Sequence, residues 1–298
     1  MPLADAKEML VAARDGGYAA CAFNVNDLEF VQAVVAAAEE ERAPTFVAMS
    51  EGALAYGGDA LARLALDVIG AAAVPLALHL DHGSSLDAAR QAVRLGFNSV
   101  MVDGSKLPYD ENAALVRAAV EEFGPEGIAV EGELGHVARG HDRGTFTEPD
   151  EAAAFVAATG VGSLAVAVGT SHGAYKFEGD PFIDVARLAA IAAATPVPLV
   201  LHGASAVYED VVRAVEEAGG RLGKARGLSD ELLREAVGRG VAKVNVDTDL
   251  RLAFVAATRR YFKDEPAALD PKKILGAARE AVREMARRKI RACGGGRV

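Results

Sequence analysis

Short apolar segments alternate with helix-like segments eight times along this chain of 298 residues. Uninterrupted apolar runs are typical of parallel strands buried on both faces, whereas half-exposed strands alternate apolar and polar residues. Eight strand–helix units predict an α/β fold in which the strands close into a (β/α)8 barrel and extra helices follow the last strand. We expect a single domain over residues 1–298.

The pattern also predicts where the elements lie. Strands are expected at 20–23, 45–48, 76–80, 99–102, 129–133, 164–168, 199–201 and 243–246. Helices are expected at 28–41, 59–72, 86–94, 111–123, 150–159, 183–193, 208–217 and 229–237, and two long helices begin near Leu250 and Pro271. A doubly wound open sheet is the main alternative. It is disfavoured because no Gly-x-Gly-x-x-Gly motif follows an early strand.

Polar side chains gather where the predicted strands end. They are Asn24, Ser50, Asp81, His82, Asp103, Glu133, His172 and His202. A barrel brings the carboxyl ends of all its strands to one mouth, where the active sites of such enzymes lie. The strands at the edges of an open sheet would keep these groups apart, so their placement favours the barrel.

The dipeptide His-Gly occurs three times, each time after an apolar run. The copies are His82-Gly83, His172-Gly173 and His202-Gly203. Catalytic zinc sites usually take three protein ligands and leave one position open, and neutral imidazole is a good ligand. A glycine beside each ligand lets backbone and substrate come close. The pattern predicts a divalent-metal site, although histidines hydrogen-bonded at turns would also explain it.

Two carboxylates, Asp103 and Glu133, end the fourth and fifth predicted strands. They would complete the metal shell, hold a second cation or orient the histidines; salt bridges at the barrel rim are the alternative. Zn²⁺ is the expected ion, and Co²⁺ or another divalent ion shares such ligands.

Asp81 directly precedes the first of these histidines. Neighbours on a strand point to opposite faces, so both side chains reach the mouth only if the chain turns, which we expect at Gly83-Ser84. A carboxylate beside a metal and a substrate hydroxyl is well placed for acid–base catalysis. The alternative is that Asp81 caps the helix near Ser85.

Two glycine- and hydroxyl-containing loops follow the last two predicted strands. They are Gly203-Ala204-Ser205 and Asn245-Val246-Asp247-Thr248, and a helix begins near Asp249. In many barrels these two loops bind phosphate with a helix N-terminus; helix capping by Asp247 or Thr248 is the alternative. A Schiff-base role for Lys243 is disfavoured because it leaves the histidines unexplained.

Composition limits the classes of partner and the cellular location that we expect. The net charge of −10 argues against a nucleic-acid or anionic-membrane partner. The two cysteines, Cys21 and Cys293, form no disulfide framework and indicate a reducing, cytoplasmic location. The N-terminus lacks the features of a signal peptide, and no apolar run is long enough for a membrane span.

Seven motifs in order give the chain a family resemblance. They are Ala22-Phe-Asn-Val-Asn26, Ser50-Glu-Gly-Ala53, Leu78-His-Leu-Asp-His-Gly-Ser84, Glu131-Gly-Glu-Leu-Gly135, Gly169-Thr-Ser-His-Gly-Ala-Tyr-Lys176, Leu201-His-Gly-Ala-Ser-Ala206 and Lys243-Val-Asn-Val-Asp-Thr-Asp-Leu-Arg251. Together they resemble class II fructose-bisphosphate aldolases over nearly the whole chain. The Ser50 motif looks more like the fructose than the tagatose enzymes, although that distinction is weak.

The resemblance implies reversible, zinc-dependent cleavage of fructose 1,6-bisphosphate to dihydroxyacetone phosphate and glyceraldehyde 3-phosphate through a metal-stabilised enediolate. It implies that His82, His172 and His202 hold the zinc and that Asp81 handles the proton of the C4 hydroxyl. It also implies that Asp103 and Glu133 match a second or alternative metal position. The positions that match substrate contacts are Asn24, Ser50, Gly173, Lys176, Gly203, Ala204, Ser205, Asn245, Val246, Asp247, Thr248 and Arg251. A monovalent cation such as K⁺ or Na⁺ near Gly173 and Ser205, and a homodimer or homotetramer, are also implied. A tagatose-1,6-bisphosphate aldolase and a non-catalytic sugar-phosphate-binding relative are the alternatives.

Two positions depart from the family. Where relatives carry a glutamate that exchanges the donor-carbon proton, this chain has His141 followed by Asp142, so either of them, or Glu148 after a loop shift, is the candidate base. The segment 135–150 is expected to form a mobile loop over the barrel mouth. Many relatives have Asp-Pro-Arg before the last helix, and this chain has a lysine, Lys272, in place of the arginine.

Overall fold

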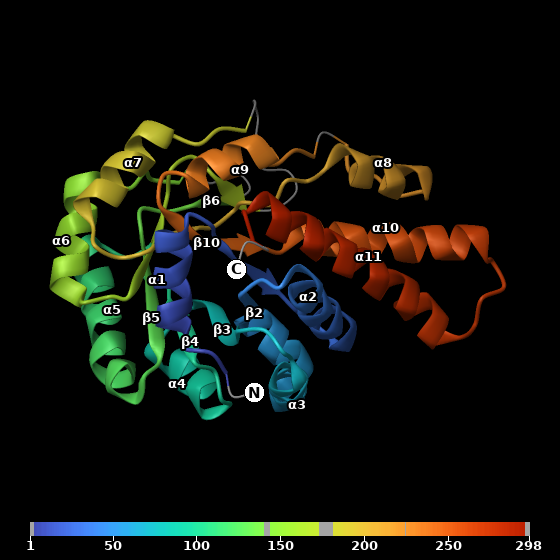
Figure 1. Cartoon of the computed structure of the whole chain (residues 1–298), viewed down its shortest axis with the longest axis horizontal. Helices are drawn as coiled ribbons and strands as arrows, with labels where there is room; N and C mark the ends of the chain where they lie inside the picture. Colours follow the sequence, from blue (N-terminus) through green and yellow to red (C-terminus); the bar gives the residue numbers. More distant parts are fainter. Residues whose placement is uncertain (1–2, 140–143, 173–180, 224, 296–298) are drawn as a thin grey trace.

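A closed barrel of eight parallel strands forms the centre of the molecule in this computed structural model, which describes residues 3–139, 144–172, 181–223 and 225–295 (Figure 1). The barrel strands are β1 (Ala20–Asn24), β2 (Thr45–Ser50), β3 (Leu76–Gly83), β4 (Ser99–Val102), β5 (Ala129–Leu134), β7 (Ser163–Val166), β9 (Leu199–Leu201) and β10 (Val241–Val246). Each strand pairs with its neighbours in the sequence, and β1 closes the barrel against β10. The predicted (β/α)8 barrel is confirmed.

Helices cover the outside of the barrel. They are α2 (Leu28–Glu41), α3 (Glu51–Ala71), α4 (Leu86–Arg94), α5 (Tyr109–Phe123), α6 (Pro149–Thr159), α7 (Val185–Ala194) and α9 (Asp230–Val237), with a 3₁₀ turn at Gly124–Glu126. The helix α8 (Glu209–Glu217) instead packs against α10 (Thr248–Asp264), away from the strands (Figure 1). Outward-facing strand residues such as Phe23, Val47 and Leu78 share one buried apolar cluster with the inner faces of these helices. No helix in the described ranges is both long and apolar enough to cross a bilayer.

The start expected for the third helix, at residue 59, is wrong. The helix α3 begins at Glu51, where the Ser50 Oγ accepts a hydrogen bond from the Ala53 N–H at 3.2 Å, and it continues through a kink at Gly58 with φ 60°. In the sequence, the pair Gly57-Gly58 resembles the end of a helix. In the structure only Gly58 has non-helical backbone angles, and the helix continues on both sides of it.

A helix that the strand–helix pattern does not contain, α1 (Ala6–Gly16), packs against the barrel. Its residues Ala6, Met9 and Leu10 are buried in one cluster with the strand residues Ala22 and Phe46, which belong to the barrel interior. Asp5 caps the helix by accepting hydrogen bonds from the N–H groups of Lys7 and Glu8. The apolar spacing and the cap were both readable in the sequence.

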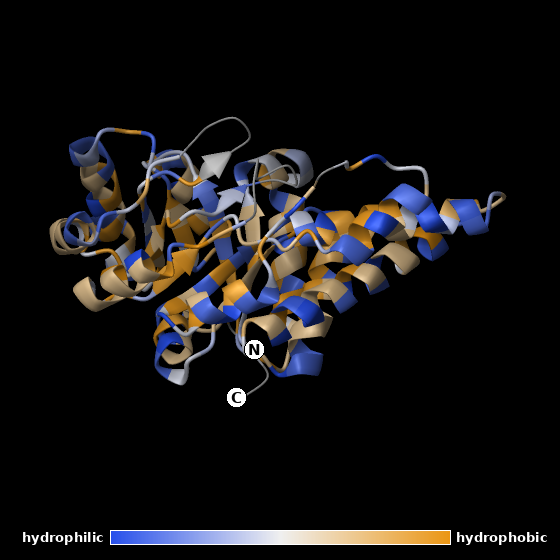
Figure 2. Ribbon diagram, turned by 90° about the horizontal axis from the view of Figure 1, so that it is seen from above, coloured by the Kyte–Doolittle hydropathy of each residue, from blue (hydrophilic) through white to orange (hydrophobic). Residues whose placement is uncertain are grey.

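The chain ends in a pair of long helices, α10 (Thr248–Asp264) and α11 (Pro271–Ala292), which extend away from the barrel (Figure 1). The helix α11 packs against α10 and α2. The Glu41 carboxylate of α2 accepts hydrogen bonds from Arg287 at 2.7 Å and from Arg291 at 2.7 and 2.9 Å. Figure 2 shows apolar residues between the packed helices and hydrophilic residues along the outer sides of the pair.

The described part of the segment 135–150 contains regular structure. The strands β6 (Ala138–Arg139) and β8 (Ser171–His172) form a small parallel sheet, and His136 and Thr145 form an antiparallel bridge. The candidate bases His141 and Asp142 lie outside the described residues.

Candidate active site

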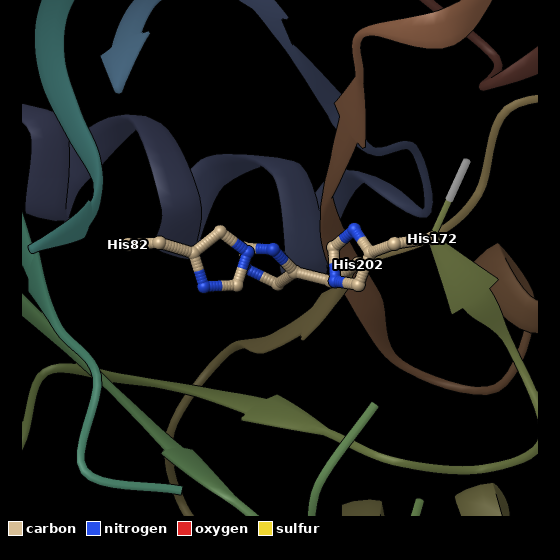
Figure 3. Close-up of side chains that lie close together, drawn as sticks. All are labelled: His82, His172 and His202. Atoms are coloured by element: carbon tan, nitrogen blue, oxygen red, sulfur yellow. The ribbon is translucent and has the colours of Figure 1, made fainter. Parts of the chain in front are cut away.

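Three imidazole rings converge at the mouth of the barrel, and they come from β3, from β8 and from the residue after β9 (Figure 3). The ring centroids lie 5.1 Å apart for His82 and His172, 4.6 Å for His82 and His202, and 6.0 Å for His172 and His202. One nitrogen of each ring lies within 4.8 Å of the other two, a spacing that one ion can bridge. The structure thus brings together the three predicted histidines.

Carboxylates hold the outward nitrogens of two of these rings. The Nδ1 atom of His82 lies 2.8 Å from the Asp103 carboxylate, and the Nε2 atom of His202 lies 2.9 Å from Glu131. The opposite nitrogens, His82 Nε2 and His202 Nδ1, are buried and have no hydrogen-bond partner in the described part of the chain. A histidine that ligates a metal almost always donates its other ring N–H to a carboxylate, a backbone carbonyl or a water molecule. The three histidines therefore have the spacing and the ring environment of ligands to a divalent metal ion such as zinc.

The backbone around His82 differs from the expected turn. Strand β3 continues to Gly83, and the register with β4 shifts between Leu80 and Gly83. His82 has a φ of 52°, in the left-handed region that few residues other than glycine adopt. This bulge, rather than a turn at Gly83-Ser84, lets Asp81 and His82 face the same mouth. A Cβ on Gly83 would lie 2.6 Å from the Met101 carbonyl oxygen, which explains the glycine.

Asp81 lies beside the ring nitrogens and is held on both oxygens. The side-chain amides of Asn24 and Asn245 each donate to it at 2.7 Å. Its Oδ1 atom lies 4.0 Å from His82 Nε2 and 3.9 Å from His202 Nδ1. The capping alternative is wrong, because the Ser85 hydroxyl caps α4. Burial favours the protonated acid, but the histidines and the Asn24 amide outweigh it and hold the pKa of Asp81 well below its usual range.

The electrostatic field at this point favours positive charge. Burial opposes a charged imidazole, yet the nearby Asp81 and Asp103 carboxylates raise the pKa of His82 to about 9. Glu133 is also buried, and burial, followed by repulsion from Asp103, raises its pKa to about 8. Donor atoms of His82, Asp103 and Glu133 lie within 4.8 Å of one another. Carboxylates arranged in this way stabilise a cation.

These groups line a cleft of about 480 Å³ at the barrel mouth. Its lining residues are Asn24, Ser50, Glu51, Gly52, Asp81, His82, His172, His202, Gly203, Ser205, Asn245, Asp247, Thr248 and Arg251. Most predicted substrate contacts are among them. The Ala204 and Val246 side chains instead lie in the apolar core, and Gly173 and Lys176 lie outside the described residues. Glu51 was not singled out; its carboxylate accepts a hydrogen bond from the Ser84 N–H.

One side of this cleft combines a loop with a helix N-terminus. The helix α10 begins at Thr248, and Asp247 makes no capping hydrogen bond to it but lies 2.6 Å from the Arg251 Nε. The Asp249 carboxylate accepts from the N–H groups of Ala206 and Val207 at 2.8 and 2.7 Å. Val207 has a φ of 50°, a costly conformation for a β-branched residue. Asp249 thus holds the loop after β9 in a shape that the loop would not adopt alone.

Lys243 is not placed as a nucleophile. Its Nζ lies 2.6 Å from the Glu131 carboxylate and 3.1 Å from His79 Nε2, inside the barrel and fully buried. Burial, followed by the Lys243 charge, lowers the pKa of His79 to about 3, so that His79 is neutral. Burial raises the pKa of Glu131, but Lys243 and His202 outweigh it and hold that pKa well below its usual range. The Schiff-base alternative therefore loses its support.

Comparisons with known proteins agree with this geometry. Residues 4–296 match the family model described as fructose-bisphosphate aldolase class II. A fructose-bisphosphate aldolase of Thermus caldophilus is 47% identical over 290 residues, which cover 95% of either chain. One of Giardia intestinalis is 40% identical, over 99% of this chain and 94% of the relative. The crystal structure of the YdjI aldolase from Escherichia coli K12 superposes with a TM-score of 0.83 at 32% identity, over 99% of this chain and 98% of the other. The chain therefore belongs to the class II fructose-bisphosphate aldolase family.

Proposed function

We propose that this aldolase uses Zn²⁺ held by His82, His172 and His202 to cleave fructose 1,6-bisphosphate reversibly into dihydroxyacetone phosphate and glyceraldehyde 3-phosphate. The observation that carries the proposal is a pair of buried nitrogens, His82 Nε2 and His202 Nδ1, which have no hydrogen-bond partner among the described residues and whose rings are anchored by carboxylates. A divalent ion bound there supplies Lewis-acid stabilisation of negative charge on the substrate oxygens. Asp103 and Glu133 are proposed to serve a second or alternative metal position, because their donor atoms group with His82.

Asp81 is proposed to take and return the proton of the C4 hydroxyl. Its hydrogen bonds from Asn24 and Asn245 fix the carboxylate in position and favour its charged form. Its Oδ1 lies 4.0 Å from His82 Nε2 and 3.9 Å from His202 Nδ1, and Asp81 lines the cleft, so the carboxylate is available to a substrate bound beside the histidines.

The substrate phosphate is proposed to bind where the loop after β9 meets the start of α10. Ser205, Thr248 and Arg251 line the cleft there, and the helix N-terminus favours an anion. Gly203, Asn245 and Asp247 line the same cleft, and Asn24 and Ser50 lie on its other side. Lys176, Gly173 and a monovalent cation near Ser205 are proposed from the family resemblance alone.

The base that exchanges the donor-carbon proton is proposed to be His141 or Asp142. The third candidate, Glu148, directly precedes α6 and accepts a hydrogen bond from Arg187, which also binds Asp184. Glu148 is 57% exposed, and an exposed ion pair contributes only about 0–1 kcal/mol, so this contact does not remove Glu148 as a candidate.

We also propose a homo-oligomer, a dimer or a tetramer, in the cytoplasm. Lys272 lies at the start of α11, at the far end of the helix pair from the mouth (Figure 1), so it would meet a substrate only in a neighbouring subunit. The cytoplasmic location is proposed because the sequence has only two cysteines, Cys21 and Cys293, and disulfides are rare in that compartment.

The test is cleavage in a coupled assay before and after chelation, with elemental analysis of the untreated protein. We expect zinc, loss of turnover on chelation, recovery on adding zinc back, and a higher kcat/KM for fructose than for tagatose 1,6-bisphosphate. Full activity without metal would exclude the metal role. A higher kcat/KM for tagatose 1,6-bisphosphate would reassign the substrate, and binding without turnover would indicate a non-catalytic relative.

A further inference from the structure

A chain of hydrogen-bonded polar groups crosses the interior of the barrel and ends at a proposed metal ligand. The Ser99 Oγ lies 2.7 Å from His79 Nδ1, and His79 Nε2 lies 3.1 Å from Lys243 Nζ. Lys243 Nζ lies 2.6 Å from Glu131 Oε2, and Glu131 Oε1 lies 2.9 Å from His202 Nε2. All five residues are buried, and they come from β4, β3, β10, β5 and the end of β9.

With Lys243 as an ammonium and Glu131 as a carboxylate, the contacts of this hydrogen-bonded network fix one arrangement of protons. A lysine ammonium donates and cannot accept, so His79 Nε2 accepts and the His79 proton lies on Nδ1, facing Ser99. The Glu131 carboxylate accepts from Lys243 through one oxygen and from His202 Nε2–H through the other. The lone pair of His202 therefore lies on Nδ1, the buried nitrogen that has no hydrogen-bond partner among the described residues and lies 3.9 Å from Asp81 Oδ1.

Stability alone does not account for these groups. Replacing a buried ion pair with well-packed apolar residues of similar volume is often neutral or stabilising. The neighbouring interior positions are apolar, for example Phe46 and Ala77, so the barrel interior accommodates such residues. Polar groups retained here point to a function beyond packing.

We propose that Lys243 is a positioning residue of the metal centre: by holding the Glu131 carboxylate it sets the orientation and tautomer of His202, and His79 and Ser99 hold Lys243 in turn. Lys243 does not touch the ion or the substrate in this arrangement. The inference rests on the proposed metal role of His202. Groups that orient a metal ligand typically change metal affinity about 10- to 100-fold when they are replaced.

The chain offers a matched control, Lys289. It is a second lysine with no exposed surface, and its Nζ lies 3.5 Å from the buried Asp249 carboxylate. Asp249 binds the N–H groups of Ala206 and Val207, and Lys289 Nζ lies 3.5 Å from the Ala204 carbonyl oxygen, so neither side chain contacts the His202 ring in the contacts described. Both Lys243→Met and Lys289→Met leave a buried carboxylate without its lysine, but only Lys243→Met disturbs the contacts of a metal ligand.

The experiment measures zinc affinity by competition with a chromogenic chelator, together with unfolding in excess chelator. We expect Lys243→Met to weaken zinc binding about 10- to 100-fold, to lower kcat at limiting zinc, and to recover activity at excess zinc with little change in KM. Lys289→Met is expected to lose stability, raise KM and keep the zinc affinity of the unchanged protein. Adding Glu131→Gln to Lys243→Met should restore stability by removing the unpaired charge, while zinc affinity stays low.

Ser99→Ala is a small change at the end of the hydrogen-bonded network that is farthest from His202. We expect it to weaken zinc binding less than Lys243→Met does. If Lys243→Met does not fold, Ser99→Ala becomes the deciding variant. Unchanged zinc affinity in folded Ser99→Ala would then overturn the inference. Unchanged affinity in folded Lys243→Met, or an equal loss in Lys289→Met, would also overturn it. If His172→Ala keeps stoichiometric zinc, the proposed metal site itself is wrong; if it loses zinc while Lys243→Met does not, only this inference fails.

Discussion

A methyl group added at Gly203 would force apart two of the three segments that carry the histidines. Gly203 follows His202 and has a φ of 64°. A Cβ there would lie 2.7 Å from the carbonyl carbon and oxygen of Ser171 and 2.9 Å from its nitrogen, and Ser171 directly precedes His172. All three atoms belong to the backbone, so no change of side-chain rotamer relieves the contact.

Two effects are expected to lower the stability of Gly203→Ala, and their free energies add. The left-handed conformation costs about 1–2 kcal/mol for a residue with a Cβ, and overpacking at a rigid contact costs about 1–3 kcal/mol. We therefore expect the substitution to lower the free energy of unfolding by about 2–5 kcal/mol. To reach an ordinary contact of 3.4 Å, the Ser171 backbone must retreat by about 0.7 Å. Site geometry tolerates only about 0.5 Å, so zinc affinity should fall by about tenfold or more.

Gly17→Ala is the matched control. Gly17 has a φ of 68°, and a Cβ there would have no atom within 4 Å, so this variant carries the conformational cost without the clash. Urea denaturation in excess chelator and zinc competition are measured for both variants. We expect Gly203→Ala to lose about 1–3 kcal/mol more than Gly17→Ala and to be alone in losing zinc affinity. Equal stability losses together with unchanged zinc affinity would refute the close-approach argument.

Three further predictions concern the ligands, the proposed acid–base group and the helix pair. His172→Ala should lose both zinc and activity, and stoichiometric zinc in elemental analysis would contradict the ligand assignment. Asp81→Asn should keep its zinc, because the carboxylate lies 3.9–4.0 Å from the ring nitrogens of His82 and His202. Its kcat should fall by about 10²- to 10⁴-fold. Turnover close to that of the unchanged protein would argue against the proton-transfer role of Asp81. Glu41→Gln should lower the free energy of unfolding by about 1 kcal/mol at pH 7. Because Arg291 and Arg287 lower the pKa of Glu41 below its ordinary 4.5, that stabilisation is complete above pH 4.5 and is lost as the pH falls through the folded-state pKa. Urea denaturation of both proteins across acidic pH should therefore show the difference closing, and a gap that is constant with pH would count against the ion pair.

The barrel was predictable because its signal is local and repeated. Each buried strand needs an apolar run and each helix an amphipathic segment, so eight units are visible without knowledge of any contact. The failures were also local. Gly57-Gly58 resembled a helix break, and α1 stands before the first strand, outside the repeating unit.

Most of the site was predictable because a parallel barrel leaves little choice about where strand ends meet. His82 and His202 lie at the ends of β3 and β9, so the topology brings them together with Asp81 and Asn245. The bulge that turns Asp81 and His82 to one side could not be predicted, because it depends on the register between β3 and β4.

The amino-acid sequence by itself determined the strand–helix repeat, the three His-Gly pairs and the loops that follow the last two strands, since each is a pattern among residues close together in the chain. Only the tertiary structure decided that Lys243 pairs with Glu131, 112 residues away, and that Lys289 pairs with Asp249. Inside an apolar strand a charged residue carries no local sign of its partner, because the low dielectric of the interior makes the partner necessary but the fold chooses which one it is.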